Sequence, residues 1–320
     1  MKHVFLFDPK AFYSQQWKMD AIIDTIGQYF RTQEMVDFSV QFSRYRRNAI
    51  VIIQEEAEKA KPGDIVRIYA VGGEEIFFDC LNTVALFPNM QLATIPYGDT
   101  DDFLKIFGGE KADGFKDVKT LINSDALPTD IIRWGVNYAL SSCSIGMNTA
   151  VSKKIKELKS NLNMNSFAVF SKLLSFFSNI ILAFNKKYAA KKYNVVIDNI
   201  EYSGNYSFIH IANSPYFNGK RTGVSHASPV DGLLDIALIK ASNPIKTLFS
   251  IRKYCAGKRP KNCIFVQGKR ITVHSSDQMW MQMDNEYIQD TNINLNVVNH
   301  AIQFVVPEGL SYPIGELSAL

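Results

Sequence analysis

The sequence predicts two domains: a doubly wound, mainly parallel α/β domain followed by a β-sandwich. The first 110 residues alternate strand and helix patterns, and short β-rich runs dominate after about Pro128. The chain has 320 residues, 47% of them hydrophobic, which is enough to fill two cores. We assign residues 1–127 to the first domain and 128–300 to the second. Residues 301–320 form a C-terminal strand and tail, for which a return to the first domain is one option.

The elements of the first domain follow from apolar runs separated by turn signals. Predicted strands are Val4–Phe7, Glu34–Phe38, Ile65–Val71 and Gln91–Ile95, and predicted helices are Trp17–Phe30, Ala49–Lys59 and Phe77–Leu86. Alternation of this kind predicts parallel strands with crossover helices. Ligands bind such sheets beyond the carboxyl ends of the strands, where the loops Gly72–Ile76 and Pro96–Phe103 fall.

The second domain is recognised by short β-rich runs. They are Val195–Ile200, Ser207–Ala212, Leu234–Ile239, Ile264–Val266, Ile271–Val273, Met279–Met283 and the late strand Ile302–Val306. One long helical region, roughly Asn148–Lys192, interrupts them. Within it, Ser166–Phe184 carries apolar residues at helical spacing between polar ones, which is typical of an amphipathic helix and not of a membrane span.

Composition excludes several classes of protein. The net charge of +4 is small, and the 35 basic residues are spread among 31 acids, so nucleic-acid binding is not indicated. The four cysteines lack zinc-ligand spacing, and a chain of this size does not need disulfide bonds to stabilise its fold. The first residues read as a strand that Pro9 ends, not as a signal peptide. We expect a cytoplasmic protein.

Six short motifs in a fixed order carry a family resemblance. Gly72-Gly73-Glu74-Glu75-Ile76, with Asp79 and Asn82 after it, resembles GGDGT-xx-E-xx-N, and Ile95–Phe103 resembles I-P-x-G-T-x-N-D-F. The other four are Ser144–Ala150, Ile211–Gly219, Ala227–Asp235 and Met283–Glu286, which resemble S-x-G-F-D-A, N-x-x-x-x-G-G-G, A-x-x-x-D-G-x-L-D and D-G-E. Together they are similar to the diacylglycerol kinase-like and sphingosine kinase-like lipid kinases.

The resemblance implies a site in the cleft between the domains, where phosphate passes from ATP to a lipid hydroxyl with the help of Mg²⁺. The family's carboxylates map onto Glu74, Asp102 and Glu286, which would then be catalytic. The implied nucleotide-binding residues are Asp8, Pro9, Gly72, Gly73, Glu75, Gly98, Asp99, Thr100 and Asp101, and a second Mg²⁺ would be held by Asp231 and Asp235. Implied partners are a lipid substrate, an anionic membrane in peripheral contact and a second copy in a homodimer.

Structural alternatives stand beside these assignments. Asp102 would cap a helix, Glu74 and Glu286 would be solvated loop residues, and Asp231 would belong to an ordinary Asp-Gly turn. Two interpretations apply to the helix Ser166–Phe184. It would rest on a membrane, or it would pack in the core with a basic end; the basic residues after it are Lys186, Lys187, Lys191 and Lys192. An NAD kinase shares the Gly-Gly-acid loop but explains the segments from Asp231 and from Met283 less well.

The main departures lie in the phosphate loop. Glu75 and Ile76 replace Gly-Thr, and Asp99-Thr100-Asp101 replaces Thr-x-Asn. A carboxylate about 4 Å from a phosphate oxygen costs roughly 4 kcal/mol at an effective dielectric near 20, unless a cation intervenes. Two hypotheses therefore remain: an ATP-dependent lipid kinase, and a non-catalytic relative that binds lipid or nucleotide.

Overall fold

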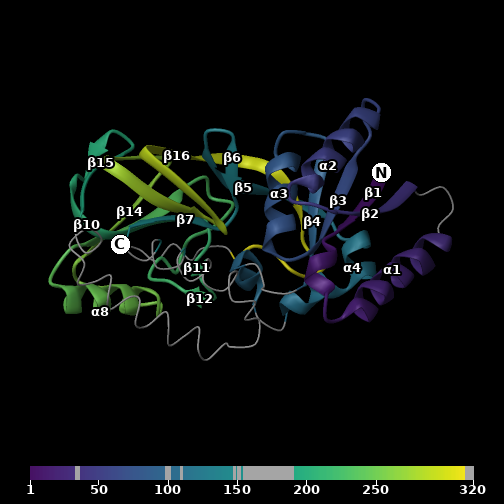
Figure 1. Ribbon diagram of the computed structural model, residues 1–320, viewed down its shortest axis with the longest axis horizontal. Coiled ribbons are helices and arrows are strands. Elements are labelled where there is room, and N and C mark those ends of the chain that lie inside the picture. The colour runs from purple at the N-terminus through teal and green to yellow at the C-terminus, as the bar shows by residue number, and fades with distance from the viewer. Residues whose placement is uncertain are drawn as a thin grey trace.

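The computed structural model describes residues 1–32, 37–97, 102–108, 111–146, 149, 153 and 191–313. Figure 1 shows an α/β region and a β-rich region side by side, with strand β16 (Glu286–Val305) running between them. This arrangement confirms the predicted fold class.

The first region is a parallel sheet in the order β2-β1-β3-β4. Its strands are β1 (Lys2–Phe7), β2 (Asp37–Phe42), β3 (Val66–Gly72) and β4 (Met90–Pro96). Its helices are α1 (Gln16–Arg31), α2 (Asn48–Lys59), α3 (Glu74–Val84) and α4 (Val118–Asn123), with 3-10 turns η1 (Pro9–Phe12), η2 (Asp102–Phe107) and η3 (Lys111–Lys116). Helix α1 contacts α4 and α2 contacts α3, one pair on each side of the sheet (Figure 1).

Burial explains why these strands could be predicted. All seven residues of β3 are buried, as expected for a parallel strand covered by helices on both faces. Strand β2, at the sheet edge, is only half-buried and begins at Asp37. The prediction near Glu34–Phe38 was therefore placed too early, and residues 34–36 lie outside the described part of the chain.

The second region is a set of antiparallel strands in the order β14-β13-β10-β7-β15-β16. The strands are β5 (Ala126–Trp134), β6 (Asn137–Ala139), β7 (Ser142–Gly146), β8 (Lys191–Ile197), β9 (Ile200–Glu201), β10 (Gly204–Ala212), β11 (Tyr216–Phe217), β12 (Lys220–Arg221), β13 (Leu234–Lys240), β14 (Cys263–Gly268) and β15 (Arg270–Met283). One apolar core includes Ile145, Ile209 and Met281, and a second includes Phe208, Ala237 and Tyr254 of helix α8 (Pro244–Tyr254).

Strand β16 joins the two regions. Its first half pairs with β15, its second half pairs with β5, and Gln303 and Phe304 pair in parallel with Gln91 and Leu92 of β4. Phe304 is fully buried in the core of the first region. The stretch Ile302–Val306, whose domain the sequence did not fix, therefore completes the first sheet.

Four other predictions need correction. The predicted strand Val195–Ile200 is divided between β8, which ends at Ile197, and β9, which begins at Ile200. Helix α3 begins at Glu74, three residues before the predicted Phe77, because Gly73 serves as its N-cap. Lys191 and Lys192 open strand β8 and do not end a helix. The predicted strands Ile271–Val273 and Met279–Met283 are one strand, β15, with an irregularity in between.

The predicted helix Ser166–Phe184 lies outside the described residues. Among the helices in the described ranges, none is long and apolar enough to span a bilayer.

Candidate active site

The Gly72-Gly73 turn connects the end of β3 to the start of α3. Gly72 has φ +152°, and a Cβ there would lie 2.9 Å from Asp8 Cβ and 3.1 Å from Ile76 Cγ2. Gly73 is more open, since its added Cβ would meet only the Tyr97 carbonyl oxygen at 3.6 Å. Gly72 is thus required by the packing of Asp8 and Ile76, which fill the space beside it.

A small, solvent-open pocket lies next to this turn. It is lined by the loop after β1, the loop after β2, the first turns of α3 and the first residue of β16. The lining residues are Asp8, Lys10, Ser43, Tyr45, Arg46, Arg47, Glu75, Ile76, Asp79 and Glu286. The pocket therefore lies beyond the carboxyl ends of parallel strands, and Glu286 of the second region contributes to its lining.

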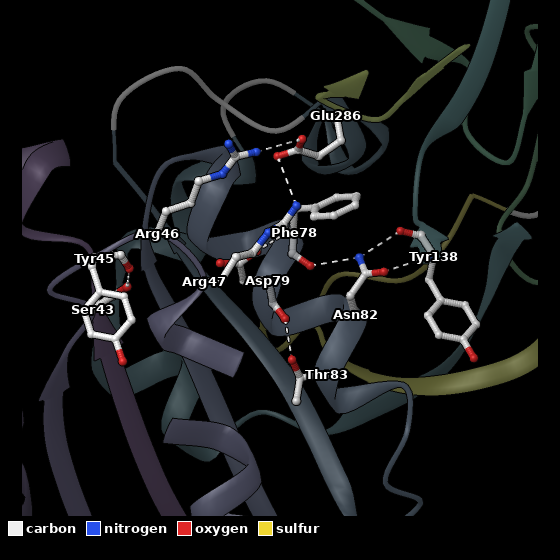
Figure 2. Close-up of polar contacts among 10 residues, drawn as sticks. All are labelled: Ser43, Tyr45, Arg46, Arg47, Phe78, Asp79, Asn82, Thr83, Tyr138 and Glu286. Carbon is white, nitrogen blue, oxygen red and sulfur yellow. Dashed lines mark hydrogen bonds and ion pairs between the residues drawn. The ribbon is translucent and has the colours of Figure 1, made fainter. Parts of the chain in front are cut away.

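Two arginines connect the regions across this pocket. The Arg47 guanidinium forms an ion pair with Asp79 of α3 and lies 3.7 Å from Glu286 Oε1. It also lies over the ring of Phe78, 5.4 Å from the centroid. Arg46 approaches Glu286 Oε2 at 3.5 Å. Figure 2 shows both side chains reaching from the β2–α2 loop toward Glu286.

The acids of the pocket repel one another. Burial raises the pKa of Asp79, Arg47 opposes that rise, and the charges of Glu286 and Glu75 add to it. Burial also raises the pKa of Asp8, against its contacts with Lys10, and the charge of Glu75 raises it further. Asp8 thus offers carboxylate oxygens of the kind that Mg²⁺ prefers, and the charge of Glu75 acts on it within the same pocket.

Asp102 is not among the residues that line the pocket. It opens η2, and one carboxylate oxygen accepts from Lys105 Nζ at 2.6 Å and from the Gly219 N–H at 2.8 Å. Asp102 therefore joins the first region to the β11–β12 hairpin. Its charge also raises the pKa of Asp284, so it lies near the turn that precedes β16.

Asp284 holds that turn in place. Its buried carboxylate accepts from the backbone N–H groups of Leu140, Ser141 and Ser142 at 2.7 to 3.0 Å. Burial raises its pKa to about 6 and these hydrogen bonds oppose the rise. Asp284 thus fixes the entry into β16, two residues before Glu286.

The Asp231–Asp235 segment forms a turn entering β13. Asp231 Oδ1 accepts from the Leu233 N–H at 2.9 Å, and Gly232 has φ +71°. Burial, with a smaller contribution from the charge of Asp231, raises the pKa of Asp235 to about 6, although Gln267 opposes the rise. Buried Asp130, which the sequence analysis missed, accepts from the Gly232 and His300 N–H groups, both at 2.7 Å.

The structure brings together only some of the predicted site residues. Asp8, Glu75 and Glu286 line one pocket, and Glu74 is the neighbouring first residue of α3. Glu286 lines the pocket and faces arginines, whereas Asp102 is not among the lining residues and is held by Lys105 and Gly219. Across the described residues, no three His, Cys, Asp or Glu side chains are close enough together to hold a metal ion. Asp231 and Asp235 therefore belong to no such group. Pro9 begins η1, while Gly98, Asp99, Thr100 and Asp101 lie outside the described residues.

Arg46 and Arg47 are the main site residues that sequence reasoning missed. The signal was the run Arg44-Tyr45-Arg46-Arg47 directly after a strand, at the edge of the sheet where ligands bind. The pairing of this run with Glu286, far along the chain, is visible only in the folded protein.

Comparison with known families supports this architecture. The diacylglycerol kinase catalytic domain family matches residues 2–134, and the YegS C-terminal NAD kinase beta sandwich-like domain family matches residues 143–306. A Staphylococcus aureus (strain Newman) protein named "Putative lipid kinase" is 24% identical over 282 residues, covering 85% of this chain and 87% of the relative. A similarly named protein from the bovine strain RF122 is 25% identical over 283 residues, with the same coverage.

Solved structures share the fold. A crystal structure named "putative diacylglycerol kinase", from Bacillus anthracis strain Sterne, matches with a TM-score of 0.74 and 18% identity, covering 97% of this chain and 96% of that one. A second crystal structure from the same strain, described as a diacylglycerol kinase, gives a TM-score of 0.68 at 15% identity, covering 97% of this chain and 98% of that one. With both family matches in order along the chain, this protein belongs to the diacylglycerol kinase-like lipid kinase family.

Proposed function

We propose that this protein transfers the γ-phosphate of ATP, with Mg²⁺, to the hydroxyl of a diacylglycerol-like lipid. The observation that carries the proposal is the position of Glu286. It comes from the second region, yet it lines one pocket with Asp8, Glu75 and Asp79 of the first. An acid at the boundary of the two regions can contact both a lipid hydroxyl held by one region and a phosphate held by the other.

In this proposal Glu286 accepts the proton of the lipid hydroxyl, and its pairing with Arg46 and Arg47 positions it. Asp8 supplies an oxygen ligand for Mg²⁺, which when bound would offset charge on the phosphate oxygens. Asp102 is a positioning residue, because it ties η2 to Gly219 across the two regions.

The test is phosphate transfer from Mg-ATP to diacylglycerol in mixed micelles. Glu286→Gln should lower kcat by roughly 10²–10⁴-fold, the range for loss of a general base, with nucleotide affinity largely kept. Glu308→Gln, which changes an exposed glutamate outside the pocket, is the matched control and should leave the rate unchanged. Transfer that survives Glu286→Gln at the wild-type rate would remove Glu286 from this role.

The position of Glu75 favours a second candidate, a non-catalytic family member that binds lipid or nucleotide. Its carboxylate lines the pocket in which phosphates would lie. Thermal unfolding with Mg-ATP discriminates the two, since a ligand at 100 times its Kd stabilises the fold by about 2.7 kcal/mol. No stabilisation at millimolar Mg-ATP, together with no transfer, would favour the non-catalytic candidate.

A further inference from the structure

We propose that Arg46 binds the phosphates of the nucleotide, so that the anion site of this chain lies on the β2–α2 loop and not on the Gly72-Gly73 turn. The inference rests on the proposed function in one respect: the ligand of the pocket carries phosphate groups. It assigns the residues that hold them, and the following observations support the assignment.

The N-terminus of α3 is poorly suited to an anion here. The first turn of α3 contains Glu74 and Glu75, which already place negative charge at the positive end of the helix dipole. Glu75 lines the pocket, and Ile76 packs beside Gly72. A phosphate at this turn would face a carboxylate where close backbone approach is needed.

The N-terminus of α2 has the opposite character. Its first turn contains no acidic residue, its N-cap makes no side-chain hydrogen bond, and the cap residue is itself Arg47. Asn48 Oδ1 accepts from the Arg44 N–H at 2.9 Å, which shapes the loop. Positive side chains and the positive end of a helix dipole therefore face the same pocket.

The two arginines have different roles. Arg47 has φ +65°, an uncommon value for a residue other than glycine, and its ion pair with Asp79 and its contact with Phe78 hold it in place. Arg47 is thus a positioning residue that fixes the loop and shields Asp79. Arg46 remains available to a ligand.

Availability follows from the geometry of Arg46. Its side chain is 73% exposed, and its ion pair with Glu286 is long, at 3.5 Å. An exposed pair of this kind contributes little, whereas a guanidinium can donate two parallel hydrogen bonds to a phosphate. When Arg46 turns to a phosphate, Glu286 loses one of its two cationic neighbours. Phosphate binding at Arg46 would thereby change the charge surrounding Glu286.

The experiment is isothermal titration of inorganic tripolyphosphate, and separately of Mg-ATP, into wild type and variants. Arg46→Gln should weaken binding of both ligands roughly 10- to 100-fold, the range for a lost charge-assisted hydrogen bond. Arg46→Lys should recover part of the affinity, because it restores the charge without the planar fork. Arg44→Gln removes an exposed charge from the same loop outside the pocket and is the matched control, expected to bind as wild type does.

The outcomes separate this inference from the proposed function. If wild type binds Mg-ATP and Arg46→Gln binds it equally well, the phosphate assignment is overturned and the kinase proposal stands. If tripolyphosphate binding depends on Arg46 but no phosphate is transferred to lipid, the kinase proposal fails and the phosphate site stands. Equal weakening by Arg44→Gln would show a general charge effect and overturn the assignment. Absence of binding of either ligand to wild type would overturn both.

Discussion

Glu75 is expected to oppose nucleotide binding. Its carboxylate lines the pocket and raises the pKa of Asp8, so both groups would repel a phosphate. Replacing Glu75 with Gly and Ile76 with Thr removes that charge and reopens the backbone beside Gly72. We expect Mg-ATP to bind about tenfold more tightly, roughly 1.4 kcal/mol, as measured by isothermal titration.

Glu55→Gln, an exposed change on α2 outside the pocket, controls for net charge and should leave that affinity unaltered. Weaker binding with reduced Mg²⁺ dependence in the double variant would show that Glu75 recruits a metal ion. Equal affinity would show that the charge of Glu75 does not act on the bound phosphates.

His210 makes stability depend on pH. It is fully buried, its Nδ1 lies 2.6 Å from the Tyr254 hydroxyl, and burial lowers its pKa from 6.5 to about 3. The unfolded chain therefore binds one more proton than the folded chain between these values. Stability from neutral His210 is present above pH 6.5 and is lost as pH falls toward 3, by about 1.4 kcal/mol per pH unit.

His210→Phe should lower the slope by the contribution of one proton, because phenylalanine fits the surrounding aromatic rings and does not titrate. His3, whose pKa burial lowers to about 4, still contributes in the variant. Urea unfolding at pH 4.5, 5.5 and 6.5 measures the slope. His226→Gln, a change at an exposed histidine, should keep the wild-type slope. A slope in His210→Phe that equals the wild-type slope would show that His210 does not contribute to the pH dependence.

At the scale of elements, Asn82 couples α3 to strand β6. Its Nδ2 donates to the carbonyl oxygens of Phe78 and Tyr138, and its Oδ1 accepts from the Tyr138 N–H at 2.7 Å (Figure 2). Asn82→Ala leaves both backbone groups of Tyr138 without these partners and should cost about 1–3 kcal/mol. Chemical denaturation measures the loss, and Asn89→Ala, which removes one exposed hydrogen bond within the first region, should cost less.

The elements were predictable where their burial has a regular pattern. Strands β1 and β3 are mostly apolar because helices cover both faces, and their predicted ranges differ little from the structure. Edge strand β2 and the short helix α4 carry weaker patterns, so one was misplaced and the other missed. The acids of the site were found through motif order. Arg46 and Arg47 were missed because a surface charge has no periodicity and its partner Glu286 is distant in sequence.

At the scale of the whole molecule, Phe304 should couple the stability of both regions. It lies on the strand that they share, and its ring packs against Phe103 at 5.4 Å and Phe115 at 6.1 Å between centroids. Phe304→Ala should cost about 3–5 kcal/mol. We expect variants that retain only Trp17 or only Trp280 to report the same lowered unfolding midpoint by fluorescence.

Phe249→Ala, at a side chain that is 67% exposed on α8, is the control and should change the midpoint little. If Phe304→Ala lowers the midpoint that Trp17 reports but not the midpoint that Trp280 reports, the two regions unfold independently and the shared strand does not couple them.

The path of β16 also has a consequence for synthesis on the ribosome. The outer edge of β4 receives Gln303 and Phe304 as partners only after the whole β-rich region has been translated. At 5–20 residues per second, the nascent α/β region waits roughly 10 to 40 s with an open strand edge and an incomplete core. Such an edge can pair with other chains, so chaperone capture of nascent chains is expected to be longest in this interval.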